Sequence, residues 1–379
     1  MSLTMRSLFP LALVAIAAPA LGAQSIFDSE LRLAPQFIQY QFKSPSNETV
    51  SELAVPVFVR IPLGSSLNVD VGTSYARARS VTGGTVSEIN GLTDTQVRGN
   101  LTLGNDFIVL TGGLNLPTGR SSVTVDQLTA AGRIASDFLA FPINSLGTGL
   151  AFTGGIAIAQ PLGDWSLGFG GAMRHSTSYE PFNVPGQSLH FQPGDEYRAR
   201  VGVDHGFGVG RVSLGLTYSA FGNDDAGGSV YHTGNRLIAQ ALATNTYAGT
   251  DVTMAAYNVF RGSGTFASGD PAGRENILNG YLGVGLHVLG TIVEPNVEGR
   301  HWLQNVPAST AGGVTTAERS QSSYLATFGL RTRIDGVGLS LFPSAGFTVG
   351  QLATVNAASV PTHANMTGFR AQLAVRFGP

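Results

Sequence analysis

The last strand-like stretch of the sequence, residues 368–377, constrains the fold more than any other feature. Its apolar residues Phe369, Leu373 and Phe377 fall on one face of an extended strand, and Arg370 and Arg376 fall on the other. This alternation with a period of two predicts a β-strand. An apolar strand at the end of a chain would give an open sheet a sticky edge. A closed barrel removes that edge, because it pairs the last strand with the first.

A terminal strand that ends in an aromatic residue resembles the assembly signal of bacterial outer-membrane β-barrels. The resemblance implies that residues 368–377 are recognised by the outer-membrane assembly machinery. It also implies that outer-membrane lipid surrounds the folded chain, which would place the protein in the outer membrane.

The N-terminus predicts export. Arg6 precedes an apolar run at residues 8–18, and small residues follow up to Ala23, which is typical of a secretory signal peptide. We expect residues 1–23 to be removed and residues 24–379 to form one barrel domain. The mature chain would then carry 21 basic and 24 acidic residues, a net charge of −3. The absence of cysteine means that this exported chain needs no disulfide.

From residue 30 onward, short alternating segments are separated by turn-forming residues. Short connections such as 161–164 alternate with long ones such as 117–147, a pattern typical of outer-membrane barrels. We predict an all-β fold, a transmembrane antiparallel β-barrel with short periplasmic turns and long extracellular loops. About sixteen strands are expected, or fourteen if the pair within 233–261 is absent. The predicted strands are 31–42, 50–62, 67–79, 94–104, 106–116, 148–160, 164–176, 194–206, 210–221, 233–243, 251–261, 275–289, 291–303, 319–334, 338–349 and 366–377.

A soluble β-sandwich or a solenoid would also show alternating strands. Its polar face would carry many Lys and Glu residues, because that face would meet bulk water. Here Lys43 is the only lysine, and the polar faces carry Gly, Ser, Thr, Asn and Arg. This composition suits a crowded or wet lumen, so it favours the membrane barrel.

The long loop 117–147 predicts a helix of its own. Thr124 and Gln127 have the spacing of a capping box, and Pro142 would end the helix after about four turns. One interpretation is a cap packed on the barrel rim, and the other is a loop folded into the lumen that narrows or gates it. The residues expected to form that constriction recur at helical spacing: Leu128, Ile134, Phe138 and Leu139.

The same region carries the most distinctive motif, Gly112-Gly113-Leu114-Asn115-Leu116-Pro117-Thr118-Gly119-Arg120. A strand that ends in Leu-Pro-Thr-Gly and opens into a long loop resembles the outer-membrane β-barrel transporter family named for the MetA pathway of phenol degradation. The resemblance covers residues 31–379 through the strand pattern. It implies a channel for aromatic or other hydrophobic compounds.

Alternation also predicts which charged residues face the lumen. If the lumen is wet, an excess of inward Arg would favour anions; if it is packed, the same Arg would pair with acids and brace neighbouring strands. The two carboxylates Glu294 and Glu298 lie on one strand face, where pairing with Arg is favoured over acid–base chemistry. The predicted pore-lining residues are Arg60, Arg98, Arg174, Arg198, Arg200, Arg211, Glu294, Glu298, Arg300, Arg331, Arg333 and Arg370, with Asp70, Asp204 and Arg376 on the same faces.

No motif predicts an enzyme. The seven His residues have no standard metal-ligand spacing, and no Gly-x-Ser-x-Gly nucleophile elbow stands at a strand-to-helix turn. We expect no cofactor, no metal and no nucleic-acid partner. Two hypotheses follow: a passive outer-membrane channel or transporter for a small, hydrophobic or aromatic solute, or a closed structural barrel with surface-binding loops and no transport.

Overall fold

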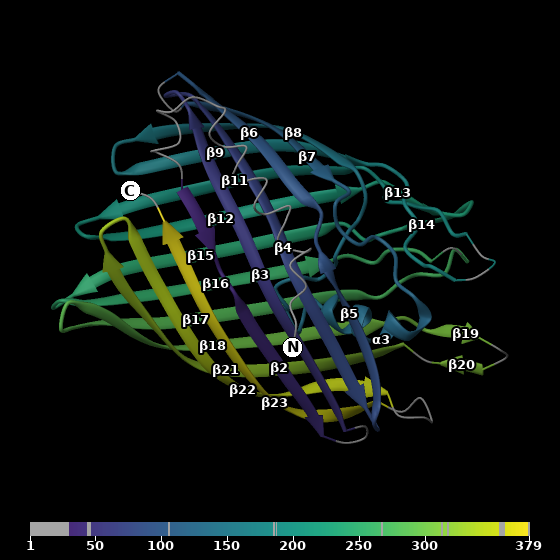
Figure 1. Ribbon diagram of the computed structural model, residues 1–379. Helices are drawn as coiled ribbons and strands as arrows, with labels where there is room; N and C mark the ends of the chain where they lie inside the picture. The colour runs from purple at the N-terminus through teal and green to yellow at the C-terminus, as the bar shows by residue number, and fades with distance from the viewer. Residues whose placement is uncertain are drawn as a thin grey trace, which may run out of the picture.

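The chain folds into a closed ring of antiparallel strands, as the computed structural model in Figure 1 shows. The structure describes residues 30–377 apart from 44–46, 105–106, 185, 187, 267, 312–313, 317 and 356–360, so the predicted signal peptide lies outside the described residues. The elements of the wall are β1 (Glu30–Leu33), β2 (Gln36–Lys43), β3 (Glu48–Leu63), β4 (Leu67–Thr82), β5 (Thr85–Leu92), β6 (Thr95–Leu103), β7 (Ile108–Leu116), β8 (Ala151–Leu162), β9 (Trp165–Ser176), β11 (Glu196–Phe207), β12 (Gly210–Phe221), β15 (Arg236–Tyr247), β16 (Thr250–Arg261), β17 (Arg274–Val288), β18 (Thr291–Val306), β21 (Arg319–Gly336), β22 (Leu339–Val355) and β23 (Pro361–Phe377).

These eighteen elements make the sixteen strands that the sequence predicts. β1 and β2 are one wall strand interrupted at Pro35, which has no N–H to give to the ladder. β5 and β6 are another, because both pair with β4, and the register shifts by one residue where residues 93–95 lie opposite residues 73–74. β15 and β16 form the pair that was uncertain in the sequence, so the fourteen-strand alternative is wrong.

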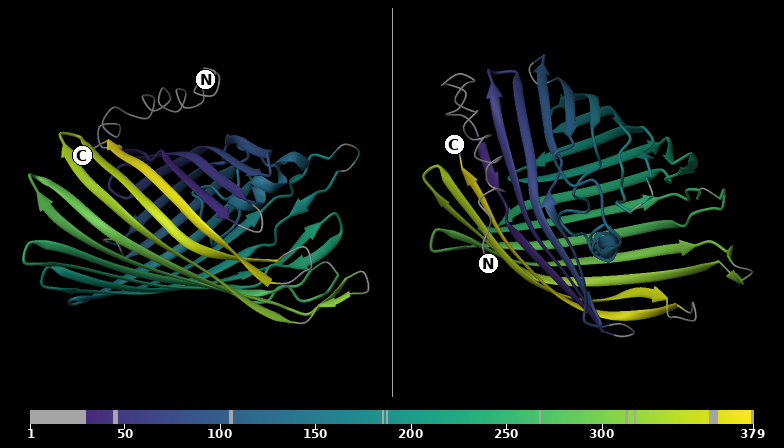
Figure 2. Two further views of the ribbon diagram at one scale, coloured as in Figure 1. Left: turned by 90° about the horizontal axis from the view of Figure 1, so that it is seen from below. Right: turned by 45° about the vertical axis from the view of Figure 1, so that its right-hand side comes forward.

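The first and last strands close the ring. Phe37 of β2 pairs with Ala371 of β23, and Leu31 of β1 pairs with Phe377. Figure 2 shows the last strand, in yellow, beside the first, in purple. This pairing leaves the apolar terminal strand without an open edge, as its sequence predicts.

The two ends of the barrel differ in the length of their connections. At the periplasmic end the turns are tight, and Gly64 (φ +83°) and Gly163 (φ +65°) supply the left-handed backbone that such turns require. At the extracellular end long loops carry two small sheets, on the right in Figure 1. These sheets consist of β10 (Phe191–Gln192), β13 (Asn223–Ala226) and β14 (Ser229–His232), and of β19 (Ser309–Ala311) and β20 (Val314–Thr316).

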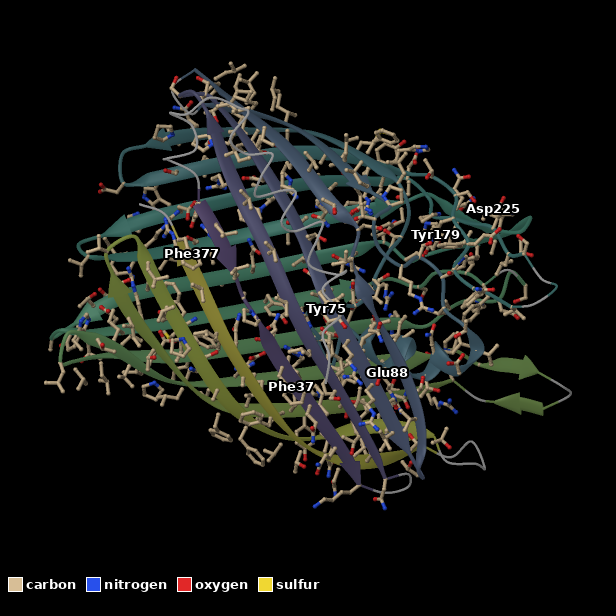
Figure 3. The ribbon with its side chains drawn as sticks, viewed as in Figure 1. Phe37, Tyr75, Glu88, Tyr179, Asp225 and Phe377 are labelled. Carbon is tan, nitrogen blue, oxygen red and sulfur yellow. The ribbon has the colours of Figure 1, made fainter. Side chains whose placement is uncertain are left out.

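The outer face of the wall is apolar and exposed, as expected where lipid covers it. Phe169, Leu214 and Phe347 are each 50–55% exposed on that face. The outer face becomes charged beyond Tyr75, toward the extracellular end. There Arg77 and Glu88 form an ion pair of 2.8 Å between Nη2 and Oε2. Figure 3 labels Tyr75 and Glu88. An aromatic residue followed by charge marks the edge of a lipid-facing belt.

This edge also fixes the level of the extracellular part of β3. Tyr75 pairs with Val55, so residues 48–54 of β3 lie beyond the belt and outside the membrane-spanning segment. The inward faces of β2–β5 at that level carry buried apolar side chains, where a polar lumen would be expected. These side chains form one cluster with residues of β21–β23 and with the loop between β7 and β8. The members of the cluster are Ile38, Tyr40, Phe42, Val50, Ala76, Ala78, Ile89, Ala130, Ile134, Phe138, Leu139, Phe141, Leu146, Leu325, Leu352, Ala364 and Met366.

Candidate functional site

The loop between β7 and β8 begins as the sequence predicts and ends its helix early. The backbone N–H of Thr124 donates to Oε1 of Gln127 at 3.1 Å, as in a capping box. A 3-10 turn η2 (Val125–Gln127) then leads into α3 (Leu128–Ile134). Neither is long and apolar enough to cross a membrane, and the same holds for every helix among the described residues.

The predicted four-turn helix up to Pro142 is wrong. After Ile134 the chain turns away from the helical path, and Ala140 adopts a left-handed φ of +47°. The carbonyl groups of Phe138 and Leu139 accept hydrogen bonds from Arg300 (2.7 Å) and from the Tyr40 hydroxyl (3.2 Å). A helix that ended at Pro142 would leave both carbonyls without a helical donor, because Pro142 has no N–H and Ile143 lies beyond it. The wall supplies their donors instead.

The loop lies inside the barrel and does not sit as a cap on the rim. Ile134, Phe138 and Leu139 are at most 2% exposed, and Figure 2 (right) shows the loop within the ring of strands. The Phe138 ring stacks on Trp302 of β18 with 5.6 Å between centroids. Leu128, the fourth residue predicted for the constriction, is 41% exposed and lies outside this packed core.

Two glutamates of β3 hold the loop from the wall. Both carboxylate oxygens of Glu48 accept from Arg133 of α3, at 2.8 and 2.6 Å, and Ser80 donates to Oε1 at 2.9 Å. Oε1 of Glu52 accepts from the backbone N–H of Ile143 at 3.0 Å. The Glu52 side chain is fully buried, and its Oε2 has no hydrogen-bond partner in the described parts of the chain. Burial raises the pKa of Glu52 to about 7.

Asp94, between β5 and β6, clamps the two ends of the loop together. Its carboxylate accepts from the backbone N–H of Gly119 (3.0 Å) and of Thr148 (2.7 Å), and from Asn115 Nδ2 (2.9 Å). Gly119 is the glycine of the Leu-Pro-Thr-Gly motif. An added Cβ there would collide with the Leu146 carbonyl and with the backbone of Asp94, so the clamp requires glycine.

The sequence interpretation missed these tethers. Glu52 already fell on the inward face by alternation, but nothing local showed that a loop 91 residues away would cover it. Asp94 stood at the start of a predicted strand and carried no signal of its own.

The predicted pore-lining residues fall into two groups, and in the first the charges are paired. On β18–β23, Glu298 accepts from Arg300 (2.8 Å) and from Arg370 (2.7 Å), and Arg331 binds Glu294 (2.6 Å). Arg370 reaches Glu298 across β22 and β21, where the inward positions beside it are glycines. The carboxylates Glu294 and Glu298 are therefore occupied by Arg, and the bracing interpretation describes this side of the barrel. Two further predicted residues pair in the same way: Arg60 with Asp70 and Arg333 with Asp335.

In the second group, on β6–β12, the Arg side chains are either unpaired within the described residues or paired but exposed. Arg98, Arg174 and Arg200 make no hydrogen bond or ion pair with any residue that the structure describes. Arg198 binds Glu196 and Arg211 binds Asp204, each at 2.7 Å, but these guanidinium side chains remain 51% and 63% exposed. We call this inner surface of β6–β12 the open wall.

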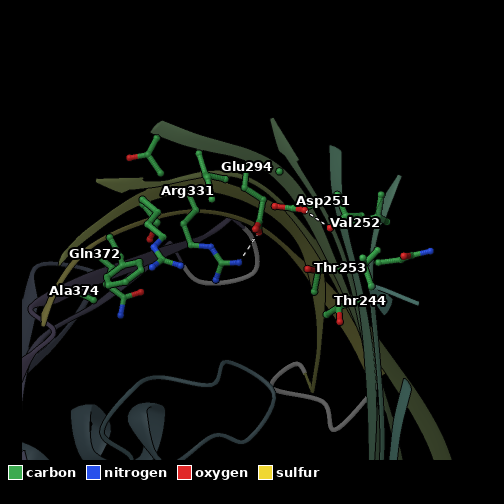
Figure 4. Close-up of a pocket in the computed structure, with 17 residues that line it drawn as sticks. Thr244, Asp251, Val252, Thr253, Glu294, Arg331, Gln372 and Ala374 are labelled. Atoms are coloured by element: carbon green, nitrogen blue, oxygen red, sulfur yellow. Dashed lines mark hydrogen bonds and ion pairs between the residues drawn. The ribbon is translucent and has the colours of Figure 1, made fainter. Parts of the chain in front are cut away.

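Cavities lie on both sides of the inserted loop. One of about 570 Å³ lies toward the periplasmic end, where Figure 4 shows Glu294 and Arg331 directed toward each other. Another, of about 670 Å³, lies between the returning part of the loop, residues 142–148, and the inner surfaces of β3, β4, β6 and β7. No group of three or more His, Asp or Glu side chains with metal-binding geometry occurs among the described residues.

Comparison with known proteins finds no matching family model and no matching curated protein. The family linked to phenol degradation is therefore not assigned. Among solved structures, a high-pH structure of OprB from Pseudomonas putida is 9% identical, with a TM-score of 0.45 over 95% of this chain and 96% of that chain. OccAB3 of Acinetobacter baumannii is 10% identical, with a TM-score of 0.44 over 92% and 99% of the two chains.

An anion-selective porin from Comamonas acidovorans is 14% identical, with a TM-score of 0.41 over 92% of this chain and 98% of that chain. At this level of similarity these structures indicate nothing about a solute.

Proposed function

We propose that this protein is an outer-membrane channel for the passive passage of small solutes, narrowed by the loop between β7 and β8. The observation that carries the proposal is that the loop covers one side of the lumen only. Its core shares one buried cluster with β2–β5 and β21–β23 and packs on β18, whereas the Arg198 and Arg211 side chains on the open wall stay more than half exposed. A loop held against one wall narrows a barrel and leaves space beside it.

The polar lining of the lumen favours the passage of water-soluble solutes. The open wall presents Arg, Thr, Gln and Asn, and the cavity at the periplasmic end presents Thr, Glu and Arg. The family resemblance implies aromatic or hydrophobic compounds instead, and such compounds would require an apolar path through the barrel. The large apolar surface inside this barrel is already buried between the loop and the wall.

The alternative is a closed structural barrel without transport, and the ion pairs on β18–β23 are the observation in its favour. Paired charges brace strands and fill space, as Arg370 does across β21 and β22. The exposed Arg198 and Arg211 side chains on the open wall favour the channel.

The test is single-channel recording of refolded residues 24–379 in a planar bilayer. We expect steady conductance, and a larger conductance when residues 124–142 are replaced by a short Gly/Ser linker. The matched control replaces the hairpin β19–β20 in the same way, because it stands off the barrel at the extracellular end (Figure 1), and it should leave conductance unchanged. Silence of both the intact protein and the 124–142 variant would overturn the channel proposal in favour of the structural barrel.

A further inference from the structure

We propose that the open wall holds a binding recess for small dianionic oxyanions such as phosphate; this inference rests on the proposed channel function. The recess is a cavity of about 220 Å³ on the inner surface of β6–β11. Its charged lining residues are Arg98, Arg174, Arg198 and Glu196. Three features of this surface suit such a ligand: its shape, its uncompensated charge and its place beside the loop.

The shape follows from the register of the strands. Arg98, Gly113, Thr153, Arg174 and Glu196 pair in turn, so they form one row across β6, β7, β8, β9 and β11. Neighbouring strands lie about 4.8 Å apart, so the backbones at the two arginines are roughly 14 Å apart. Gly113 has no side chain to fill the space between them. The long side chains of Arg98 and Arg174 can therefore extend across Gly113 and Thr153 toward one ligand.

The charge of the recess is not compensated. Arg98 and Arg174 have no hydrogen-bond or ion-pair partner in the described parts of the chain, and the single acid, Glu196, is bound to Arg198 at 2.7 Å. Asp70 pairs with Arg98 in register, but its carboxylate is engaged by Arg60 (3.0 Å) and by Asn100 (3.0 Å). Three guanidinium groups against one carboxylate leave a net charge of +2 in the recess, which a dianion would balance.

The chemistry of the lining suits an oxyanion in particular. Guanidinium groups bind phosphate and carboxylate through two parallel N–H donors, a geometry that chloride cannot match. The Thr153 hydroxyl and the Gln96 side-chain amide also line the recess, and neither has a hydrogen-bond partner among the described residues. They supply neutral donors for the remaining oxygens.

The recess lies on the route past the loop. It shares Gln96, Asn115 and Arg174 with the cavity of about 670 Å³ beside residues 142–148. An anion that passes the loop on this side would meet the open wall there. The recess would favour anions over cations and would slow those oxyanions that bind it.

The test uses inorganic phosphate as the probe, in two measurements. In planar bilayers, phosphate should reduce the chloride current of the intact channel in a saturable way. The double variant Arg98→Gln/Arg174→Gln should weaken that block by about tenfold or more, since charge-assisted hydrogen bonds are among the strongest in proteins. The control Arg331→Gln removes one lumen charge from a paired site and should keep the block within about twofold.

Calorimetric titration of phosphate into the refolded protein in micelles tests the recess without requiring conductance. Binding to the intact protein that the double variant loses supports the recess, even if the channel is silent. Equal phosphate binding by the intact protein and the double variant, or none by either, would overturn the recess and leave the channel proposal standing on its own conductance.

Discussion

Replacing Phe138 by Ala tests whether a packed core holds the loop inside the barrel. The Phe138 side chain is 1% exposed and stacks on Trp302, whereas its carbonyl bond to Arg300 belongs to the backbone and survives the change. Truncating a buried Phe to Ala costs about 3–5 kcal/mol. At about 1.4 kcal/mol for each factor of ten, the population of the released loop should rise roughly a hundredfold to a few thousandfold.

Amide hydrogen exchange measured by mass spectrometry on the refolded protein reports this population, because exchange of protected amides follows local opening. Peptides that cover residues 128–143 should exchange faster in the Phe138→Ala variant by that factor. Peptides from β8 to β16 should not change, because the substitution releases the loop and leaves the wall intact. The matched control is Leu128→Ala, on the same loop but 41% exposed, which should change exchange by less than about tenfold.

Unchanged exchange in residues 128–143 would refute the packed-core account of the loop. A uniform increase in the whole wall would refute it as well, because it would mean that loop and barrel unfold as one unit.

Three further predictions concern the tethers. Burial raises the pKa of Glu52 to about 7, so the inserted loop gains most from this group below the ordinary carboxyl pKa of 4.5 and loses that gain as the pH rises through 7. Loop exchange, corrected for its intrinsic pH dependence, should then be faster at pH 8 than at pH 5, and Glu52→Gln should abolish the difference; equal protection at both pH values would contradict this. Asp94→Ala removes the clamp, so current fluctuations in bilayer recordings should become more frequent, and a trace as quiet as that of the intact protein would count against the clamp. Gly119→Ala places a Cβ against the Leu146 carbonyl, so the loop should lose its protection from protease, and full protection would show that the backbone can shift.

The barrel itself could be derived from the sequence. Alternation with a period of two decides which residues face lipid and which face the lumen, and it does so in each strand independently of the others. For this reason the sixteen strands and the seam between the first strand and residues 368–377 followed from local patterns. The interruptions of two wall strands at Pro35 and at Asp94 are also local, and they leave the number of wall strands at sixteen.

The state of the lumen was decided only by the tertiary structure. Whether an inward Arg is paired depends on residues that are far from it in the sequence. Arg370 binds Glu298, 72 residues away, across two glycines. Arg98 and Arg174 have only Gly113 and Thr153 between them in the same row. The helix in the loop ends at Ile134, and the residues that follow it are held by contacts with the wall: Phe138 stacks on Trp302 and its carbonyl accepts from Arg300. Periodicity records the direction of a side chain relative to its own strand, but packing and pairing depend on contacts between segments far apart in the chain.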